Sequence, residues 1–453
     1  MDIPAKKFGF FTASAMVVGI VIGSGVFKSA GDVINASGGN LTVALLAWFI
    51  GGLIIMISTY AFSIVALKNT KASGIIDYVE DYFGAKMAYM VGWFVQFVYY
   101  PVLVGILSWL AGDVTQILFG LDNAIWPLTI LYFIGIYALN LISPRIAGKT
   151  QVSTMVIKLI PLVMIAGAGL VVGLFNGNTL TALSERATNV TARTGAGLAA
   201  AVAVTAFAYD GWILALSITQ ELKDAKKILP KALFFGSAFI VAVYMLFFLG
   251  LSGVVSNNEA IVNAGSLDTS VIAAERLFGV FFGNVVSVMI LISVLGTLNG
   301  LTMGAVRGMY QIAVRGHGPA TRHFTDLAKN DAPVKGGLLS VAVSVFWLGV
   351  WYGNFQGWWG GFIDTSVLSI VFLYIAYILV YVDIVKNFDE LPSWKRYGVP
   401  ILATIAALYL IYGAFTSAPL MFVYFAGIVF VILGIGLLLY GPTQSALDTG
   451  KKN

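Results

Sequence analysis

The chain has 453 residues, of which 59% are hydrophobic and only 10% are charged, and its mean hydropathy is +0.91. Soluble domains contain about 45–50% apolar and about 25% charged residues. This composition therefore excludes a soluble enzyme, a nucleic-acid-binding protein and a disordered chain. The net charge of +5 is interpreted as a record of loop orientation in a lipid bilayer, not as a sign of an acidic partner.

The N-terminal segment carries Lys6 and Lys7 ahead of an apolar run, as a signal peptide does, but no small-residue cleavage site follows that run. We therefore predict that it is retained as the first membrane span. The chain contains no cysteine, so no disulfide can form within it or to a partner subunit.

Apolar stretches bounded by charged or turn residues predict twelve membrane-spanning helices. We place them near residues 10–35, 41–67, 84–118, 124–142, 150–174, 196–222, 230–255, 280–313, 337–353, 360–383, 397–415 and 419–441.

The positive charges support this layout. All but five of the 26 Lys and Arg residues fall on the side of the membrane that holds the N-terminus. The exceptions are Arg186, Arg193 and Arg276 on the opposite side, and Lys28 and Lys158 within spans. Because positive loops face the cytoplasm, we expect both termini to be cytoplasmic, including a C-terminal tail at residues 442–453.

Two of the predicted spans contain residues that interrupt a helix. The first holds Gly23-Ser24-Gly25 near its middle, and the sixth holds Asp210-Gly211. Glycine weakens a helix by about 1 kcal/mol relative to alanine, and an Asp at the bilayer centre costs at least about 2.5–3.5 kcal/mol. Interrupted helices at the start of each half indicate a transporter built from two inverted five-helix repeats.

We therefore predict an all-α membrane fold with broken helices one and six. A single transporter domain would cover residues 1–441. Its first repeat would lie at about 10–174, its second at about 196–383, and two additional helices at about 397–441.

The first break offers chemistry for both ends of an amino acid. If the helix unwinds at Gly23-Ser24-Gly25, the amides that start the outer half-helix lack partners and carry the positive end of a helix dipole, which suits a carboxylate. The last carbonyls of the inner half-helix suit an ammonium group. The alternative interpretation is a continuous helix in which Gly19 and Gly23 form a GxxxG packing face.

The sixth span extends the same idea. Backbone carbonyls of Phe207, Ala208 and Asp210 would accept from the ammonium group, while Tyr209 and Trp212 would line a side-chain pocket. Three roles stay open for the Asp210 carboxylate: it binds a cation, takes up a proton, or caps the second half-helix. A purely structural Asp, hydrogen-bonded to neighbouring helices, is the alternative.

Lys158 is a charged residue about 12 Å into the fifth span, at about 1.5 Å per residue. A fixed ammonium beside an unwound helix can hold exposed carbonyls, as a bound sodium ion does elsewhere. Pro161 would kink this helix and free carbonyls for it. The alternative is a lysine that extends along the helix to the membrane surface.

The eighth span carries a stripe of small residues. Gly296, Gly300, Gly304 and Gly308 recur every four residues and predict a face for close helix packing.

Tyrosines and a glutamine in the third and seventh spans are polar side chains with reach towards a central cavity. These residues are Gln96, Tyr99, Tyr100 and Tyr244. Of them, Tyr244 joins Gly23, Tyr209 and Trp212 as a candidate pocket residue.

No sign of enzymatic or cofactor chemistry is apparent in the sequence. His317 and His323 lie in a basic loop without a cysteine or a carboxylate cluster, which makes a poor metal site. There is no phosphate-binding loop and no embedded nucleophile–base pair. We therefore expect no catalytic residues, no metal and no cofactor.

Three motifs resemble one family. They are Ile22-Gly-Ser-Gly-Val-Phe27, Phe207-Ala-Tyr-Asp-Gly-Trp-Ile213 and Lys158-Leu-Ile-Pro161. In this arrangement the chain resembles, over about residues 8–440, the amino acid–polyamine–organocation superfamily, which has the leucine-transporter-type fold. Within it, the sequence is most similar to the L-type amino-acid transporters and their bacterial serine/threonine exchanger relatives.

The resemblance implies where a substrate would bind. The α-carboxylate would lie on the amides of Ser24 and Gly25. The α-amino group would lie on the carbonyls of Val21, Phe207, Ala208 and Asp210. Lys158 matches a lysine that stands where sodium-driven relatives bind an ion, which implies sodium-independent transport.

The resemblance also implies the kind of transport. Most members exchange one amino acid for another by alternating access, and Asp210 agrees with the bacterial serine/threonine type. We therefore expect an antiporter for small neutral L-amino acids, such as alanine, serine, threonine, cysteine and glycine, in a microbial plasma membrane. A proton-coupled permease, with Asp210 or Lys158 titrating, is the alternative, and a membrane sensor that binds amino acids without transporting them is a third possibility.

Animal members pair with a glycoprotein through a cysteine in the loop after the third span. The corresponding loop here, at residues 119–123, has no cysteine. We therefore expect no disulfide-linked heavy subunit, and the only partners expected are the amino-acid substrate and the lipid bilayer.

Overall fold

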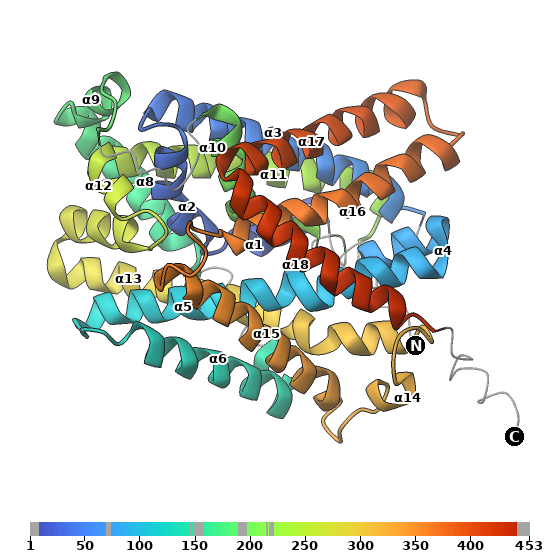
Figure 1. The fold of residues 1–453 in the computed structure, drawn as a ribbon. Coiled ribbons are helices and arrows are strands. Elements are labelled where there is room, and N and C mark those ends of the chain that lie inside the picture. The colour runs from blue at the N-terminus through green and yellow to red at the C-terminus, as the bar shows by residue number, and fades with distance from the viewer. Residues whose placement is uncertain are drawn as a thin grey trace, which may run out of the picture.

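The computed structural model describes residues 9–68, 74–144, 146–148, 157–188, 197–213, 216 and 222–441, and its regular elements there are helices (Figure 1). This confirms the predicted all-α class. Several predicted features lie outside the described residues: the charges at Lys6, Lys7, Lys71, Arg145, Lys149, Arg193, Lys451 and Lys452, the start of the fifth span, most of the second half of the sixth, and the tail from residue 442.

Each predicted span contains a helix. In the first five spans, the helices are α1 (Phe10–Val21) and α2 (Gly25–Ala36), α3 (Leu41–Ala66), α4 (Ile75–Phe94) with η1 (Val95–Tyr99) and α5 (Tyr100–Phe119), α6 (Ile125–Ile142), and α8 (Leu159–Phe175). In the next five, they are α10 (Leu198–Tyr209), α11 (Ala225–Ser252), α13 (Asp268–Ala313), α15 (Val334–Phe355) and α16 (Thr365–Asn387).

The last two spans hold η3 (Trp394–Gly398) with α17 (Val399–Ser417), and α18 (Pro419–Leu438). Three short helices lie in the connections: α9 (Asn178–Ser184), α12 (Asn257–Val262) and α14 (Thr321–Phe324). In Figure 1 the long helices run side by side, with α9 and α12 at one end of the molecule and α14 at the other.

The number of membrane crossings agrees with the prediction only in part. In the described part of the chain, nine helices are long and apolar enough to cross a membrane, or up to eleven if each of two bent pairs counts as one span. The sixth predicted span contributes α10, an apolar helix too short to cross alone. Twelve crossings and the inverted repeat therefore remain predictions.

Two predicted starts coincide with sharp turns inside helices. Gly84 in α4 has φ 77° and ψ 174°, and Gly279 in α13 has φ 74° and ψ 171°. Positive φ is readily adopted only by glycine, so each residue separates a preceding helical segment from the apolar one that follows. The third and eighth spans were predicted to begin at residues 84 and 280, which is where the chain turns.

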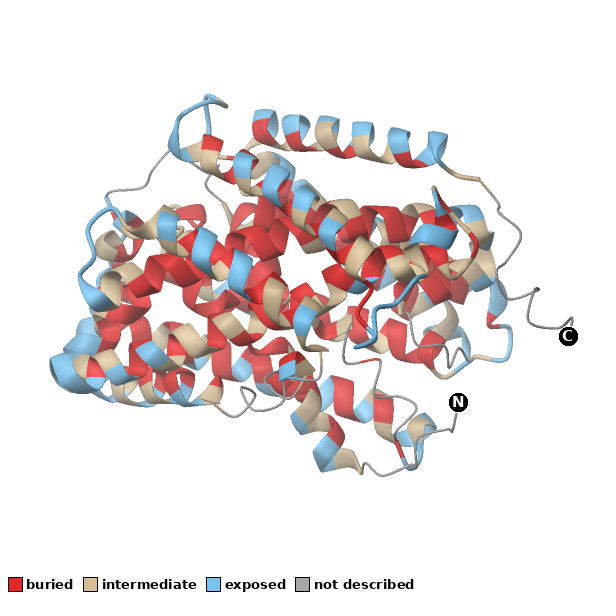
Figure 2. Ribbon diagram, turned by 90° about the horizontal axis from the view of Figure 1, so that it is seen from below, coloured by how far each residue is buried: buried red, intermediate tan, exposed pale blue. Residues whose placement is uncertain are grey.

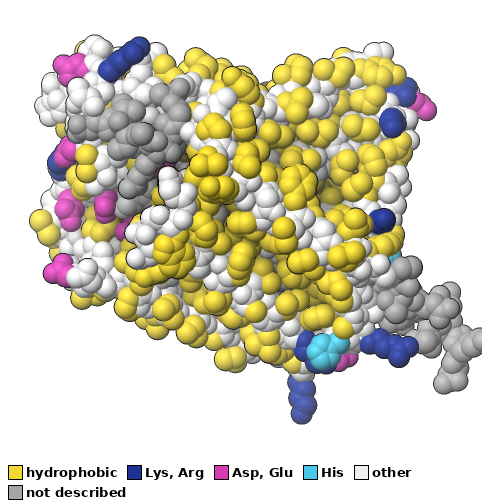
Figure 3. All heavy atoms as spheres, in the orientation of Figure 1, with side chains coloured by type: hydrophobic (Ala, Val, Ile, Leu, Met, Phe, Trp, Pro, Cys, Tyr) yellow, Lys and Arg dark blue, Asp and Glu magenta, His cyan; other side chains and the backbone are white. Residues whose placement is uncertain are grey.

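The helices form a buried centre and a lipid-facing periphery. In the most apolar stretch of each helix, the share of buried residues is 83% for α4–α5 and 78% for α16. The same share is only 22% for α6 and for α18. Figure 2 shows the buried residues concentrated on the inner helices. In Figure 3 hydrophobic side chains cover the middle of the surface and charged ones gather towards its two ends. Such a broad apolar surface requires lipid against it.

Candidate functional site

The first helix breaks where the sequence predicts it. α1 ends at Val21 and α2 begins at Gly25, and the two axes differ by 58°. Ile22 has ψ 113°, which is extended backbone. The continuous-helix interpretation is therefore wrong, and the amides of the first turn of α2 and the carbonyls of the last turn of α1 lack intrahelical partners.

The second break follows α10. That helix ends at Tyr209, and Asp210, the C-cap residue that follows it, has φ −71° and ψ 166°. Gly211 then has φ 92°, so the α-helix does not continue into the Asp-Gly pair. The last carbonyls of α10 thus become available next to the first break.

The two breaks touch at Gly25. A Cβ atom added to this residue would lie 2.7 Å from the Cα atom of Ala208 and 2.8 Å from the carbonyl oxygen of Phe207. Both distances are well below the contact distance of about 3.5–4.0 Å between carbon atoms. The absence of a side chain at this position is therefore what allows the start of α2 to meet the end of α10.

A cavity of about 70 Å³ lies between the breaks. It is lined by every residue that the sequence proposed for contact with an amino-acid backbone: Val21, Ser24, Gly25, Phe207, Ala208 and Asp210, together with Gly23 and Lys158. The Ser24 hydroxyl is buried and has no hydrogen-bond partner among the described residues, so a polar atom in the cavity wall is left for a bound molecule.

Lys158 points into the protein and not towards the membrane surface. It precedes α8, its side chain is 2% exposed, and its Nζ atom donates to Thr297 Oγ1 at 3.5 Å. A Cβ atom on Gly23 would lie 2.7 Å from the same Oγ1 atom. Thr297 on α13 therefore stands between the ammonium group and the first break.

The Asp210 carboxylate is held by a tyrosine from another helix. Tyr99 on η1 is 3% exposed, and its hydroxyl donates to Asp210 Oδ2 at 2.6 Å. The bond joins the second break to the helix that contains the π-helical turn. This contact does not decide whether Asp210 binds a cation, takes up a proton or caps a helix. The carboxylate can accept further hydrogen bonds from the cavity that it lines.

Replacement of Tyr99 by phenylalanine is expected to destabilise the protein. Hydrogen bonds to charged groups contribute about 1.5–3 kcal/mol, and the variant leaves the partly buried Asp210 oxygen without its donor. We expect a lower midpoint of thermal unfolding for the purified protein. The matched control is Tyr424→Phe, which alters a tyrosine that is 44% exposed on α18. Equal midpoints for the two variants would contradict the stabilising role of the bond.

The three aromatic residues proposed for the pocket pack outside this cavity. The Tyr209 hydroxyl donates to the carbonyl oxygen of Trp48 at 2.9 Å. Trp212 packs against Phe62 and Tyr377 with ring centroids 5.0 Å and 5.1 Å away. Their contribution to a pocket remains a prediction for a more open state of the site.

Tyr244 supports the second break directly. It lies on α11, is fully buried, and its hydroxyl donates to the carbonyl oxygen of Ala208 at 3.1 Å. A carbonyl oxygen has a second lone pair, so this bond leaves Ala208 able to accept from a ligand.

Several residues that line the cavity were missed by the sequence analysis. They are Ile20, Leu103, Leu107, Thr297, Gly300 and Leu301. Most are apolar residues in apolar helices and carry no local signal, whereas Gly300 belongs to the predicted glycine stripe.

Two other residues of that stripe, Gly304 and Gly308, have the predicted packing role. A Cβ atom on Gly304 would lie 2.5 Å from the Tyr100 ring, and one on Gly308 would lie 1.8 Å from Gln96 Oε1. The stripe therefore lets α13 pack closely against η1 and α5.

Comparison with known proteins identifies the family of this chain. The model of the amino acid permease family matches residues 8–445. The serine/threonine exchanger SteT of Bacillus subtilis (strain 168) is 32% identical over 316 residues, which are 68% of this chain and 68% of that protein.

Animal transporters are more distant relatives. Human Asc-type amino acid transporter 1 is 27% identical over 336 residues, which cover 71% of this chain but only 63% of that protein, less than two thirds of its length. Human large neutral amino acids transporter small subunit 2 is 24% identical over 444 residues, or 96% of this chain and 79% of that protein. These matches confirm the resemblance inferred from the three motifs. The chain, which has a cavity between two broken helices, therefore belongs to the amino acid permease family of multi-pass membrane transporters.

Proposed function

We propose that the protein is a sodium-independent exchanger that carries small neutral L-amino acids across a microbial plasma membrane by alternating access. The observation that carries this proposal is the meeting of the two breaks, where residues at the start of α2 and at the ends of α1 and α10 line one cavity. The three relatives named above support transport of amino acids, and the Bacillus relative supports exchange.

The backbone groups suit both ends of a zwitterion. A carboxylate on the amides of Ser24 and Gly25 would gain the positive end of the α2 dipole. An ammonium group would donate to the carbonyls of Val21, Phe207 and Ala208. Because these are backbone groups, they recognise what all amino acids share, and the remaining walls must select the side chain.

Those walls favour a small side chain. Leu103, Leu107 and Leu301 close the cavity with apolar groups. With about 10–15 Å³ of such volume needed per water-sized group, a cavity of about 70 Å³ suits a molecule of the size of alanine or serine and is small for leucine.

Sodium independence is supported by Lys158. Its buried ammonium reaches Thr297 beside the first break, where it provides a fixed positive charge next to the exposed carbonyls. Cytoplasmic termini, two inverted repeats and operation without a disulfide-linked subunit also belong to this proposal, the last because the chain has no cysteine.

The test is counterflow in proteoliposomes. Uptake of labelled alanine would be measured with and without unlabelled amino acid inside, in sodium and in choline. An exchanger takes up label only when amino acid is inside, at the same rate in both salts. Uptake into empty vesicles that follows an imposed proton gradient would instead make the protein a symporter with Asp210 and Lys158 as proton candidates, and binding without flux would make it a sensor.

Replacement of Leu107 by alanine should widen the substrate range. The variant removes most of a side chain that is 1% exposed and lines the cavity. Differences of a few methylene groups in an apolar pocket are worth about 1–3 kcal/mol, or roughly 10–200-fold. We expect counterflow of leucine relative to alanine to rise by at least about tenfold. An unchanged ratio in a variant that still exchanges alanine would show that Leu107 does not contact the substrate side chain.

A further inference from the structure

A second polar cluster lies on α2, one turn beyond the first break. Lys28 is 1% exposed, and its Nζ atom lies 3.1 Å from Asp32 Oδ2 on the same helix. It also donates to Asp364 Oδ2 at 3.2 Å and to Ser366 Oγ at 3.3 Å, both at the start of α16. One ammonium group therefore faces two carboxylates.

The two carboxylates are not equally satisfied. Asp364 caps α16 and accepts from the amides of Ser366 and Val367 at 3.1 Å and 3.2 Å, and from the Ser366 hydroxyl. Asp32 is held less completely: its Oδ2 atom lies 3.1 Å from Lys28 Nζ without the alignment of a hydrogen bond, and the carboxylate accepts from the backbone of Gly265. An ionised carboxylate has about four acceptor positions, so Asp32 can still accept from a positively charged donor.

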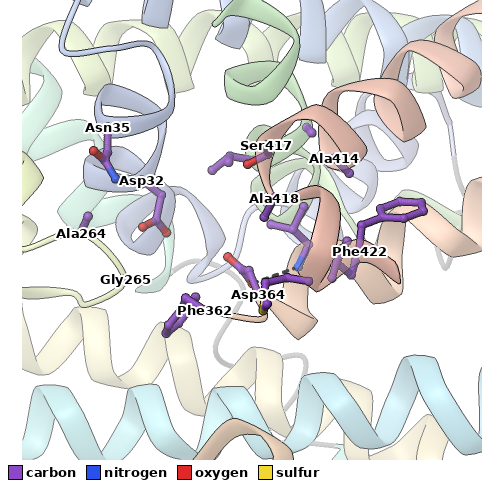
Figure 4. A pocket seen from close by; sticks show the side chains of 15 residues that line it. Asp32, Asn35, Ala264, Gly265, Phe362, Asp364, Ala414, Ser417, Ala418 and Phe422 are labelled. Carbon is purple, nitrogen blue, oxygen red and sulfur yellow. Dashed lines mark hydrogen bonds between the residues drawn. The ribbon is translucent and has the colours of Figure 1, made fainter. Parts of the chain in front are cut away.

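A cavity of about 60 Å³ lies in front of these two acids (Figure 4). In the figure the Asp32 and Asp364 side chains lie on either side of it, and Phe422 stands on the wall that α17 and α18 form. The side chains of Asp32 and Asp364 remain 16% and 25% exposed, so the space in front of them is reachable. No described residue that lines this cavity is positively charged, and none of them lines the cavity between the breaks.

The charge and polarity of the residues that line this cavity limit the kind of ligand that it can bind. Two carboxylates and one ammonium group give the cluster a net charge of −1. This charge favours the binding of a cation. It disfavours a zwitterion, because the carboxylate of the zwitterion would be repelled. Much of the remaining wall is apolar, including Phe362, Met421 and Phe422. A bare metal ion needs several oxygen ligands, whereas an ammonium group with a short hydrocarbon body suits an acidic side facing an apolar one.

We propose that this cavity is a binding site for a small primary alkylammonium ion. Its ammonium group pairs with Asp32 and Asp364, and its alkyl group packs against Phe362 and Phe422. With about 10–15 Å³ needed per water-sized group, the cavity accepts a molecule of the size of ethylammonium. The inference does not depend on the proposed transport function.

The test is thermal unfolding of the purified full-length protein, which needs no transport. Because a ligand that binds only the folded state stabilises it in proportion to the logarithm of its excess concentration, ethylammonium chloride should raise the unfolding midpoint progressively. Sodium chloride and tetraethylammonium chloride at equal ionic strength should not. The series is run with and without alanine, so that binding between the helix breaks is recognised by its loss when alanine is present.

Three variants make the result specific. Asp32→Asn should remove the ethylammonium shift, while Asp383→Asn, a buried acid at the far end of α16, should keep it. Lys28→Gln leaves the cluster with two negative charges and should lower the concentration needed for half of the shift by at least about tenfold, a change of about 1.4 kcal/mol. General structural damage would weaken binding in both cluster variants. The proposal is overturned by the absence of a shift in the wild type, by an equal shift with sodium, by a shift that alanine removes, or by a shift that survives Asp32→Asn.

Discussion

Replacement of Gly25 by alanine is expected to abolish amino-acid exchange. The new Cβ atom would lie 2.7 Å from Ala208 Cα and 2.8 Å from the Phe207 carbonyl oxygen. Both partners are backbone atoms, so no side chain can rotate away, and the two breaks must separate by roughly 1 Å to restore contact distances. Since a displacement of about 1 Å at a reacting centre costs on the order of 100-fold in rate, we expect a loss of at least that size in proteoliposome counterflow.

The control for this variant is Gly167→Ala. Gly167 lies within α8, and an added Cβ atom there meets no atom within 4 Å. The Gly167→Ala variant therefore gains the helix propensity of alanine without a clash, and its exchange rate should equal that of the wild type. A Gly25→Ala protein that is folded in detergent and exchanges at the wild-type rate would show that the breaks do not need to touch.

Replacement of Lys158 by alanine should slow exchange more than it lowers the amount of folded protein. The ammonium group is 2% exposed and reaches Thr297, which lies against the first break. Without it, α8 loses its polar link to the break. Coupling free energies of about 1–3 kcal/mol correspond to about 5–150-fold, and we expect the rate per folded molecule to fall within that range.

A surface lysine provides the comparison. Lys68 is 48% exposed and pairs with Glu390 at 2.6 Å, and such pairs contribute little. Lys68→Ala should therefore exchange like the wild type. If Lys158→Ala also retains the wild-type rate at equal protein, Lys158 has no part in the conformational cycle.

The fold could be predicted in large part because lipid imposes a simple rule. A helix must satisfy its own backbone inside the membrane, so long apolar stretches identify themselves, and even the turns at Gly84 and Gly279 coincide with predicted span starts. The short helical segments before those glycines were missed, since nothing in a hydropathy pattern distinguishes them from loops.

The site was predictable where it depends on backbone. Gly23-Ser24-Gly25 and Asp210-Gly211 are out of place in a membrane helix, and that conflict marked both breaks. Side-chain walls were not predictable, because which face of α5 or α13 meets the cavity depends on helix rotation. Thr297 illustrates this limit: its hydroxyl donates to the Ser293 carbonyl at 3.0 Å, a common arrangement in helices, and only packing brings it to Lys158.

The ion pair between Lys28 on α2 and Asp364 at the start of α16 was missed for a different reason. Lys28 was noted only as a positive charge within a span, and its partner Asp364 is 336 residues away in sequence. Pairing over that distance follows from the arrangement of α2 and α16, which no local pattern encodes.

The two glycine turns have a consequence for ancestry. Gly84 and Gly279 have φ and ψ values that agree within a few degrees, and they occur in the third helix of each proposed half. If the halves are inverted repeats, these turns lie at opposite membrane surfaces. A common ancestor of the two halves would then have been a five-helix protein able to insert in either orientation, and the turn would be a backbone trace of that duplication in two sequences that no longer resemble one another.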